Sequence, residues 1–314
     1  MRLFSKAKKE KDAWMVFAPT TQGMALATMR RQGAATPVLL GCAEVALQSE
    51  GGQEALARAA RARNAMRYRC STLLSPSEYQ MLTVEAPNVP QEELKTAVRW
   101  RMKDMLDFHV DDATFDIMSI PVERASGRTP SMFVVAARNS VVRQRQERFF
   151  DAGVALEVID IPENAQRNVS ALLEEDGRGL GMLSVGPQGG LLTVTYLGEL
   201  YLARRIDVTT ELLEDQDADR RHATLDRLML EVQRSLDHFE RQFSFISIAR
   251  MVLAPGSNEA LLSYLSSNMY MPVVQTNLAD VIDLSAVPEL LDPAQQAYYF
   301  FALGAALRQE LVTP

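Results

Sequence analysis

Three histidines are the side chains of this sequence best suited to bind a metal or to move a proton near neutral pH. They are His109, His222 and His238, and they lie far apart in the sequence. His238 has Asp237 and Glu240 close by, but the spacing is not that of a metal-binding motif. We therefore expect each histidine to be a surface or packing residue.

A group of carboxylates follows the first histidine. Asp111, Asp112 and Asp116 could in principle form the paired carboxylates of acid–base chemistry. Side chains alternate between the two faces of a strand, so Asp112 and Asp116 would share one face and Asp111 would lie on the other. This spacing favours a solvated face over an active site.

The cysteines and the sequence motifs offer no other reactive centre. Cys42 and Cys70 belong neither to a Cys-x-x-Cys pair nor to a Cys/His cluster, and they fit a reducing compartment. The sequence has no Gly-x-Ser-x-Gly elbow, no Walker loop and no Gly-x-Gly-x-x-Gly after a strand. We predict no catalytic residue and no metal site.

Composition narrows the possible functions. The chain has 314 residues, of which 47% are apolar, which is enough for a sizeable core in one large bilobal unit or two domains. Its net charge of −7 disfavours general binding to nucleic-acid phosphates. The apolar stretch at 297–307 is far shorter than the ~18 residues that cross a membrane. The basic residues at 1–11 lead into Asp12 rather than into the apolar segment of a signal peptide, so we expect a cytoplasmic protein.

Apolar periodicity and turn residues indicate a mixed α/β chain whose two halves both begin with strands. For the first half we predict helices at 53–69, 90–106 and 140–152, and strands at 14–17, 24–29, 68–74, 80–85, 114–121, 131–137 and 154–161. For the second half we predict a helix at 163–173, a meander of strands at 180–185, 191–196 and 199–206, a helix at 223–242, a strand at 248–254 and two further helices.

Five segments in one order carry a resemblance to a known family. They are AVRWRMKDMLDFHVDDATFDI (97–117), MFVVAARNSVV (132–142), AGVALEVIDIPENA (152–165), LEVQRSLDHFERQF (230–243) and YFFALGAALR (299–308). Together they resemble the PilM/MshI family of type IV pilus (MSHA-type) biogenesis proteins, although Asp107 stands where the family has a proline. The resemblance is nearest to the MshI branch, because the fold segments are kept while the nucleotide motifs are lost.

The resemblance implies an α/β, actin-like (ribonuclease H-like) two-lobed fold with a small inserted α+β subdomain. Residues 1–160 would form the first actin-like lobe, with the inserted subdomain at about 80–143. Residues 161–293 would form the second lobe, and residues 294–314 a terminal helix that returns to the first lobe.

The turns that hold nucleotide in an actin-like ATPase are altered in this chain. Such turns use glycines for close backbone approach and acidic residues to position magnesium. Here the corresponding turns have no acidic residue, so the resemblance implies vestigial turns and a degenerate ATPase, with ATP and magnesium disfavoured as cofactors. Neutral turns can still admit a phosphate to their backbone amides, although tight turns are the simpler expectation. The residues of these turns are Thr20, Thr21, Ser184, Gly186, Gly189, Gly190, Gly256 and Ser257.

The function that the resemblance implies is that of a non-enzymatic scaffold of a type IV (MSHA-like) pilus assembly machine. The protein would lie in the cytoplasm, peripheral at the inner membrane, and bind the N-terminal cytoplasmic tail of a PilN-like bitopic inner-membrane protein. It would link that partner to the pilus motor ATPase. The tail would lie in a groove between the first lobe and the inserted subdomain, with Trp100 and Phe108 as candidate groove residues.

Two other functions stay open on the sequence alone. An active actin-like ATPase with altered phosphate loops would bind nucleotide in a magnesium-dependent way. A self-assembling filament protein would scatter light as its concentration rises. The oligomeric state is not predicted.

Overall fold

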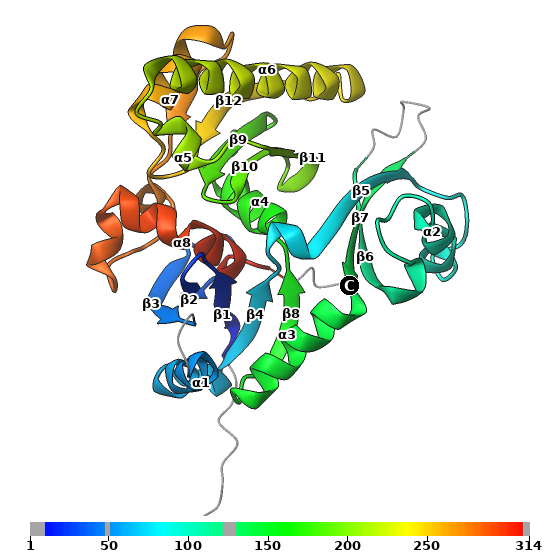
Figure 1. The fold of residues 1–314 in the computed structure, drawn as a ribbon, viewed down its shortest axis with the longest axis vertical. Coiled ribbons are helices and arrows are strands. Elements are labelled where there is room, and N and C mark those ends of the chain that lie inside the picture. Colours follow the sequence, from blue (N-terminus) through cyan, green and yellow to red (C-terminus); the bar gives the residue numbers. More distant parts are fainter. Residues whose placement is uncertain (1–9, 48–50, 122–129, 310–314) are drawn as a thin grey trace, which may run out of the picture.

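Two five-stranded sheets form the cores of two lobes (Figure 1). The computed structural model describes residues 10–47, 51–121 and 130–309. The first sheet has the strand order β3 (Val38–Ala46), β2 (Gly23–Arg30), β1 (Glu10–Pro19), β4 (Tyr68–Leu73) and β8 (Leu156–Asp160). The second has the order β11 (Glu199–Ile206), β10 (Gly189–Tyr196), β9 (Gly179–Gly186), β12 (Ile248–Leu253) and β13 (Val273–Gln275).

Both lobes follow one topology. In each sheet, three consecutive strands form an antiparallel meander. Two later strands then add in parallel beside the first strand of that meander. The predicted meander at 180–206 is therefore confirmed, and the first lobe contains its counterpart.

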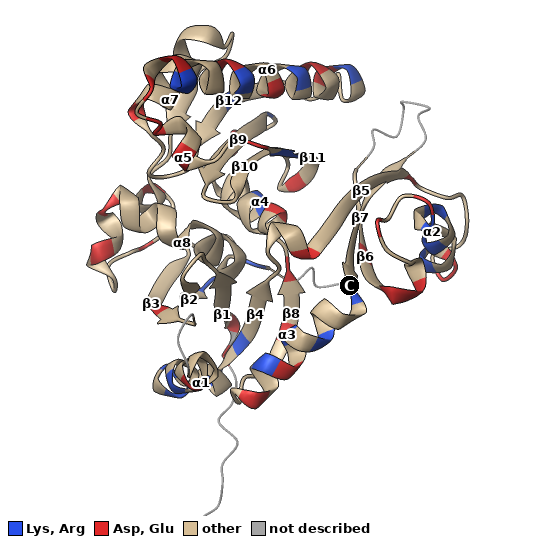
Figure 2. Ribbon diagram, in the orientation of Figure 1, with Lys and Arg blue, Asp and Glu red and all other residues tan. Residues whose placement is uncertain are grey.

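The central strand β1 is buried on both faces. Its side chains alternate, so Val16 and Ala18 enter the core between the lobes while Met15 and Phe17 enter a second core on the other face. Charged residues accordingly gather on outer helices and are sparse on these central strands (Figure 2). A strand covered on both faces is expected to be almost wholly apolar, as the run Ala13 to Ala18 is.

Helices cover both faces of each sheet. The outer face of the first sheet packs against α1 (Gly52–Ala62) and α3 (Asn139–Asp151). The outer face of the second packs against α5 (Thr210–Leu213), α6 (Ala218–Gln242) and α7 (Glu259–Asn268). In the described part of the chain, none of the helices has the length and apolar character needed to span a bilayer.

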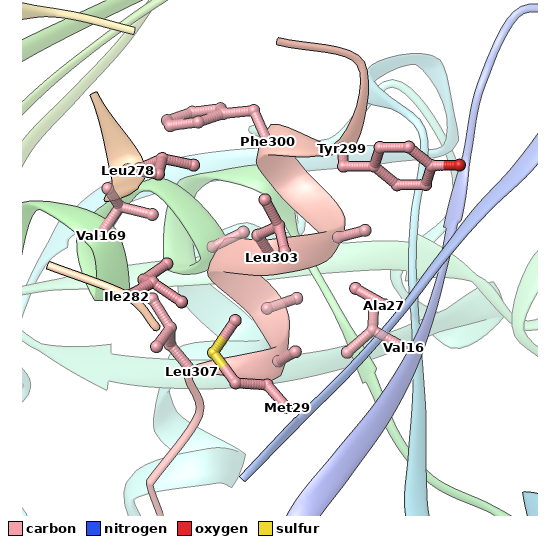
Figure 3. Close-up of a cluster of buried hydrophobic side chains, with 14 of the residues drawn as sticks. Val16, Ala27, Met29, Val169, Leu278, Ile282, Tyr299, Phe300, Leu303 and Leu307 are labelled. Atoms are coloured by element: carbon pink, nitrogen blue, oxygen red, sulfur yellow. The ribbon is translucent and has the colours of Figure 1, made fainter. Parts of the chain in front are cut away.

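Two helices, α4 (Pro162–Leu173) and α8 (Pro293–Ala306), lie between the sheets and join the lobes. In Figure 3, Leu303 of α8 lies among side chains that include Val16 of β1 and Val169 of α4. The helices cross so closely that a Cβ at Gly304 would overlap the carbonyl oxygen of Ala165. The terminal helix therefore packs on the first-lobe sheet and on α4 at the same time.

A third sheet belongs to the inserted subdomain and packs against the second lobe through Phe133. Its strands are antiparallel in the order β5 (Tyr79–Glu85), β7 (Ser131–Arg138) and β6 (Ala113–Ser119), and α2 (Leu94–Met102) covers one face. The sheet ends at Arg138, and α3 returns to the first lobe through the buried ring of Phe149. Residues 139–143, which we had assigned to the insertion, thus begin a first-lobe helix.

Candidate functional site

The first predicted nucleotide turn joins β1 to β2 and is stabilised by its own residues. The Thr20 hydroxyl oxygen accepts hydrogen bonds from the backbone N–H groups of Gln22 and Gly23, at 3.3 and 3.0 Å. Thr21, which lies between Thr20 and Gln22, is exposed. The Thr20 hydroxyl therefore stabilises the turn.

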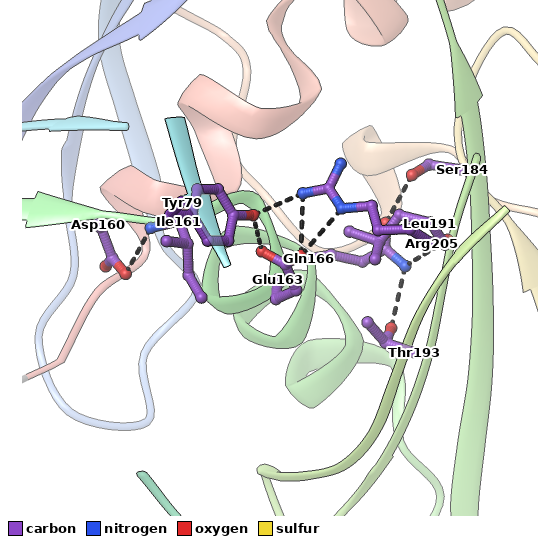
Figure 4. Close-up of polar contacts among 9 residues, drawn as sticks. All are labelled: Tyr79, Asp160, Ile161, Glu163, Gln166, Ser184, Leu191, Thr193 and Arg205. Carbon is purple, nitrogen blue, oxygen red and sulfur yellow. Dashed lines mark hydrogen bonds and ion pairs between the residues drawn. The ribbon is translucent and has the colours of Figure 1, made fainter. Parts of the chain in front are cut away.

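The second turn presents its serine to the protein interior. Ser184 is buried at the end of β9, and its hydroxyl donates to Gln166 Oε1 on α4 at 2.6 Å (Figure 4). Gln166, itself fully buried, donates through Nε2 to three acceptors. These are the carbonyl oxygens of Met182 and Leu191, at 3.0 and 3.1 Å, and the Thr193 hydroxyl, at 2.9 Å. Ser184 is thus one member of a satisfied buried network.

The glycines of the second turn are hairpin residues. Gly189 pairs with Gly186, and Gly190 pairs with Val185, where β9 turns into β10. A Cβ at Gly186 would meet open space, whereas one at Gly190 would lie 3.4 Å from Ile206 Cβ.

The third turn packs against the start of α8. Gly256 has a φ of +70°, and a Cβ there would lie 2.7 Å from Ala297 Cβ and 3.1 Å from the Pro293 carbonyl oxygen. Ser257 donates from its hydroxyl to the Ala254 carbonyl oxygen at 2.7 Å. The close approach that Gly256 permits is therefore made to a helix of the same chain.

The three turns lie beside the same apolar core, but the described residues there do not form a set of metal ligands. Ala18 and Ala254, which precede the first and third turns, lie in one apolar core with Met182 of β9. Over residues 10–47, 51–121 and 130–309, no cluster of three or more His, Cys, Asp or Glu side chains could hold a metal ion. Whether these turns bind nucleotide stays a prediction.

A buried ionic junction, which we did not predict from the sequence, joins the lobes to the inserted subdomain (Figure 4). Glu163 of α4 is 2% exposed. Arg205 of β11 donates to Glu163 Oε1 from Nε at 3.0 Å and from Nη2 at 2.9 Å. Tyr79 of β5 donates its hydroxyl to Glu163 Oε2 and accepts from Arg205 Nη2 at 2.6 Å. The junction thus joins the inserted sheet to the second-lobe sheet and to α4.

The junction changes the titration of its own members. Burial, followed by the charge of Glu163, raises the pKa of Tyr79. Burial lowers the pKa of Arg205, but the charges of Glu163 and Tyr79 and the hydrogen bonds to both together outweigh burial and raise that pKa overall. Glu163 follows Pro162 and looks from the sequence like an ordinary helix-start residue, so nothing in the pattern marked it as buried.

A cavity of about 900 Å³ lies between the first lobe and the inserted subdomain, and we call it the groove. One wall is the face of the inserted sheet opposite α2; its residues are Thr114, Asp116, Met118, Val135 and Ala137. A second wall is β8 with the residue after it, and a third is α4; their residues are Val158, Ile159, Asp160, Ile161, Asn164, Arg167, Asn168 and Ala171. The remaining lining residues are Arg31, Leu74, Lys95, Phe115, Val142, Gly198, Glu199, Arg308 and Gln309.

The charges in the groove are unevenly paired. Arg308 contacts Asp160 at 2.7 Å, whereas Lys95 lies 3.4 Å from Asp116 and Arg167 lies 3.9 Å from Glu199. Arg31 donates to the Leu307 carbonyl oxygen at 2.9 Å. Among the described residues no carboxylate pairs with Arg31.

Three arginines that line the groove keep an unsatisfied donor inside the protein. The Nε–H groups of Arg31, Arg167 and Arg308 have almost no exposed surface and reach no acceptor within the described ranges. Burial, followed by the charge of Arg167, lowers the pKa of Arg31. These Nε–H groups therefore do not face the cavity, and what the groove offers a ligand is the positive charge of its basic side chains.

The two predicted groove residues lie elsewhere. Trp100 is 71% exposed on α2, and Phe108 packs beside the α2 cluster under the Arg138 guanidinium, 4.5 Å from its ring. Neither lines the groove. The basic residues that do line it come from distant parts of the chain, and no local pattern marks them.

Comparisons with known proteins bear on the fold. No protein-family model matches the chain, and no curated protein matches it. The chain is similar to a solved structure of a PilM-PilN type IV pilus biogenesis complex, with 21% identity, a TM-score of 0.72 and coverage of 96% of this chain and 98% of that chain. This likeness, spanning both lobes and the insertion, confirms the predicted actin-like, PilM-like fold.

Weaker likenesses accompany it. One is to a Bacteroides thetaiotaomicron protein of actin-like ATPase fold and unknown function, with 11% identity, a TM-score of 0.48 and coverage of 92% of this chain and 98% of that chain. Another is to the cytoplasmic domain of EpsL, an inner-membrane component of the Vibrio cholerae type II secretion system. It has 14% identity, a TM-score of 0.42 and coverage of 65% of this chain and 78% of that chain.

Proposed function

We propose that this protein is a non-enzymatic scaffold of a type IV pilus assembly machine that captures the N-terminal cytoplasmic tail of a PilN-like bitopic inner-membrane protein. The groove is the observation that carries the proposal, because it is a large cavity between the first lobe and the inserted subdomain and basic side chains line it. The solved structure to which the chain is similar is described as a PilM-PilN complex, and this supports the choice of partner.

The groove suits a short peptide on physical grounds. Ordering each residue of a flexible tail costs about 1–2 kcal/mol. Burying one large apolar side chain contributes about 1.5–3 kcal/mol, so a few apolar anchors offset the ordering of a short segment. Met118, Val135 and Val142 provide apolar walls for such anchors.

Tail capture would hold the scaffold at the cytoplasmic face of the inner membrane through its partner. From there it would link the partner to the pilus motor ATPase. Within this proposal we favour an MSHA-like machine and the MshI branch, on the sequence resemblance and the loss of acidic residues from the turns.

We further propose that the nucleotide turns are vestigial and the protein is a pseudo-ATPase. Ser184 stands where a magnesium-directing carboxylate would be expected, and its hydroxyl is hydrogen-bonded to Gln166. Gly256 faces Ala297 of α8. These internal contacts support structural turns, and ATP and magnesium are not proposed as cofactors.

Filling the groove tests where the tail binds. Ala171 lines the groove on α4, so Ala171→Trp should reduce binding of a synthetic PilN-like tail by at least about tenfold through steric overlap. Trp100→Ala is the matched control, because Trp100 lies outside the groove, and it should leave binding unchanged. Thermal unfolding of both variants checks that they fold. Unchanged binding by a folded Ala171→Trp variant would show that the tail binds elsewhere.

A further inference from the structure

The wall of the groove formed by β8 is the edge of a sheet. β8 pairs with β4 on one side, and no described strand pairs with its other side (Figure 1). Four consecutive residues, 158–161, line the groove. Because successive side chains of a strand point to opposite faces, consecutive residues can line one cavity only where the cavity meets the edge. The groove is therefore open to the main chain of β8.

The hydrogen bonds around β8 show which main-chain groups face the groove. Leu74 N–H donates to the Asp160 carbonyl oxygen at 2.8 Å, so the main chain of Asp160 faces β4. Main-chain groups of alternate residues point to opposite sides of a strand, so the N–H and C=O of Ile159 point to the free edge. The next outward group, Ile161 N–H, donates to Asp160 Oδ1 at 2.9 Å. Pairing along this edge would thus be centred on Ile159 and stop at Ile161.

The opposite side of the groove complements an extended chain. Met118, Val135 and Ala137 share one face of the inserted sheet and provide apolar contact for alternate side chains.

We propose that the captured tail binds as an extended strand added to the free edge of β8. Its main chain exchanges hydrogen bonds with Ile159, and its apolar side chains at alternate positions contact the inserted sheet. The occupant is thus an extended peptide segment with apolar residues at every second position. This inference rests on the proposed tail capture and specifies the conformation in which the tail binds.

Strand addition divides recognition between two features of the peptide. The edge of β8 binds main chain, which is common to every sequence and contributes affinity. The inserted sheet contacts only every second side chain of the peptide, and this contact contributes specificity. Substitutions of the side chains between them should be tolerated.

A scan of N-methylated peptides tests the proposal. Synthetic PilN-like tails carrying one N-methyl group at successive positions are titrated into the full-length protein. N-methylation removes one donor, so the one position whose N–H donates to the Ile159 carbonyl oxygen should weaken binding by about five- to tenfold, and the positions on either side of it by less than about twofold. Methylated tails that all bind alike would overturn strand addition while leaving tail capture intact. Absence of binding by the unmethylated tail would overturn both.

Hydrogen exchange gives a second readout on the protein side. The Ile159 amide should exchange about tenfold or more slowly in the complex than in the free protein, because it gains an acceptor. The Ile161 amide is the internal control, since it already donates to Asp160, and its rate should change by less than about twofold. An Ile159 amide that is unaffected by a bound tail would contradict the proposal.

Discussion

The turns between the lobes and the groove beside β8 are both rich in polar groups, but they use them differently. In the turns, the hydroxyls of Thr20, Ser184 and Ser257 are hydrogen-bonded within the protein. In the groove, Arg31 pairs with no carboxylate among the described residues, and Arg167 lies 3.9 Å from Glu199. A satisfied network stabilises a fold, whereas a cation without a close partner favours a ligand that supplies acceptors. The difference locates binding capacity in the groove.

The strongest test of the comparison is to restore an acidic residue to the second turn. Ser184→Asp should lower the free energy of unfolding by about 4 kcal/mol, because it buries a carboxylate against Gln166 Oε1. Ser184→Ala, which loses one hydrogen bond, should cost only about 1 kcal/mol. Urea denaturation gives both values. A stable Ser184→Asp variant that binds magnesium-ATP would show that this turn still faces a nucleotide site.

Breaking the buried junction should have the next largest effect. Glu163→Ala leaves Arg205 and Tyr79 without their carboxylate and should destabilise the protein by about 3 kcal/mol. The figure is at the lower end of the range for buried pairs because Arg205 is 37% exposed. Tail affinity should fall as well, since the junction holds β5 against α4 beside the groove. Glu199→Ala, at the loose 3.9 Å pair with Arg167, is the control and should have little effect on stability.

Removing one unpaired cation of the groove should affect binding more than stability. Arg31→Ala should weaken tail binding by about tenfold, because a guanidinium group that lines the groove is lost. Calorimetric titration measures the change, with thermal unfolding as the control for folding. Tail binding that is unaffected by Arg31→Ala would mean that the bound tail does not use this cation.

The smallest expected effect concerns alkaline pH. The raised pKa of Tyr79 means that the unfolded chain loses this proton at a lower pH than the folded chain. The stabilising effect of the protonated tyrosine is therefore complete below pH ~10 and declines as the pH rises further, by up to ~1.4 kcal/mol per pH unit. Tyr79→Phe should make the loss of stability above pH ~10 correspondingly less steep in urea denaturation. Parallel pH profiles for the two proteins would contradict the burial of this hydroxyl.

Much of the fold could be predicted from local patterns, and the misses have local causes. The meander of the second lobe and the helix at 223–242 show clear periodicity, and both are present. We missed β3, whose mostly half-buried side chains give no clean alternation of apolar and polar residues. The predicted helix at 53–69 is too long. In the structure α1 ends at Ala62, and Asn64 adopts a left-handed φ of +53°, which a helix cannot continue through.

The groove could not be predicted residue by residue. Arg31 follows β2, Arg167 lies on α4 and Arg308 follows α8, so only the packed fold brings them to one cavity. Trp100 was a candidate because its helix belongs to the inserted subdomain, yet it lies on the exposed side of α2. Sequence patterns indicate which face of a single helix or strand is buried. This site instead combines a strand edge with residues at the ends of several helices and strands.

The most direct test of the account is a pair of calorimetric titrations on one sample of the full-length protein, one with a synthetic PilN-like tail and one with magnesium-ATP. The account predicts saturable binding of the tail, lost in Ala171→Trp, and no binding of magnesium-ATP. Magnesium-dependent ATP binding without tail binding would contradict it and would restore an active actin-like ATPase as the function.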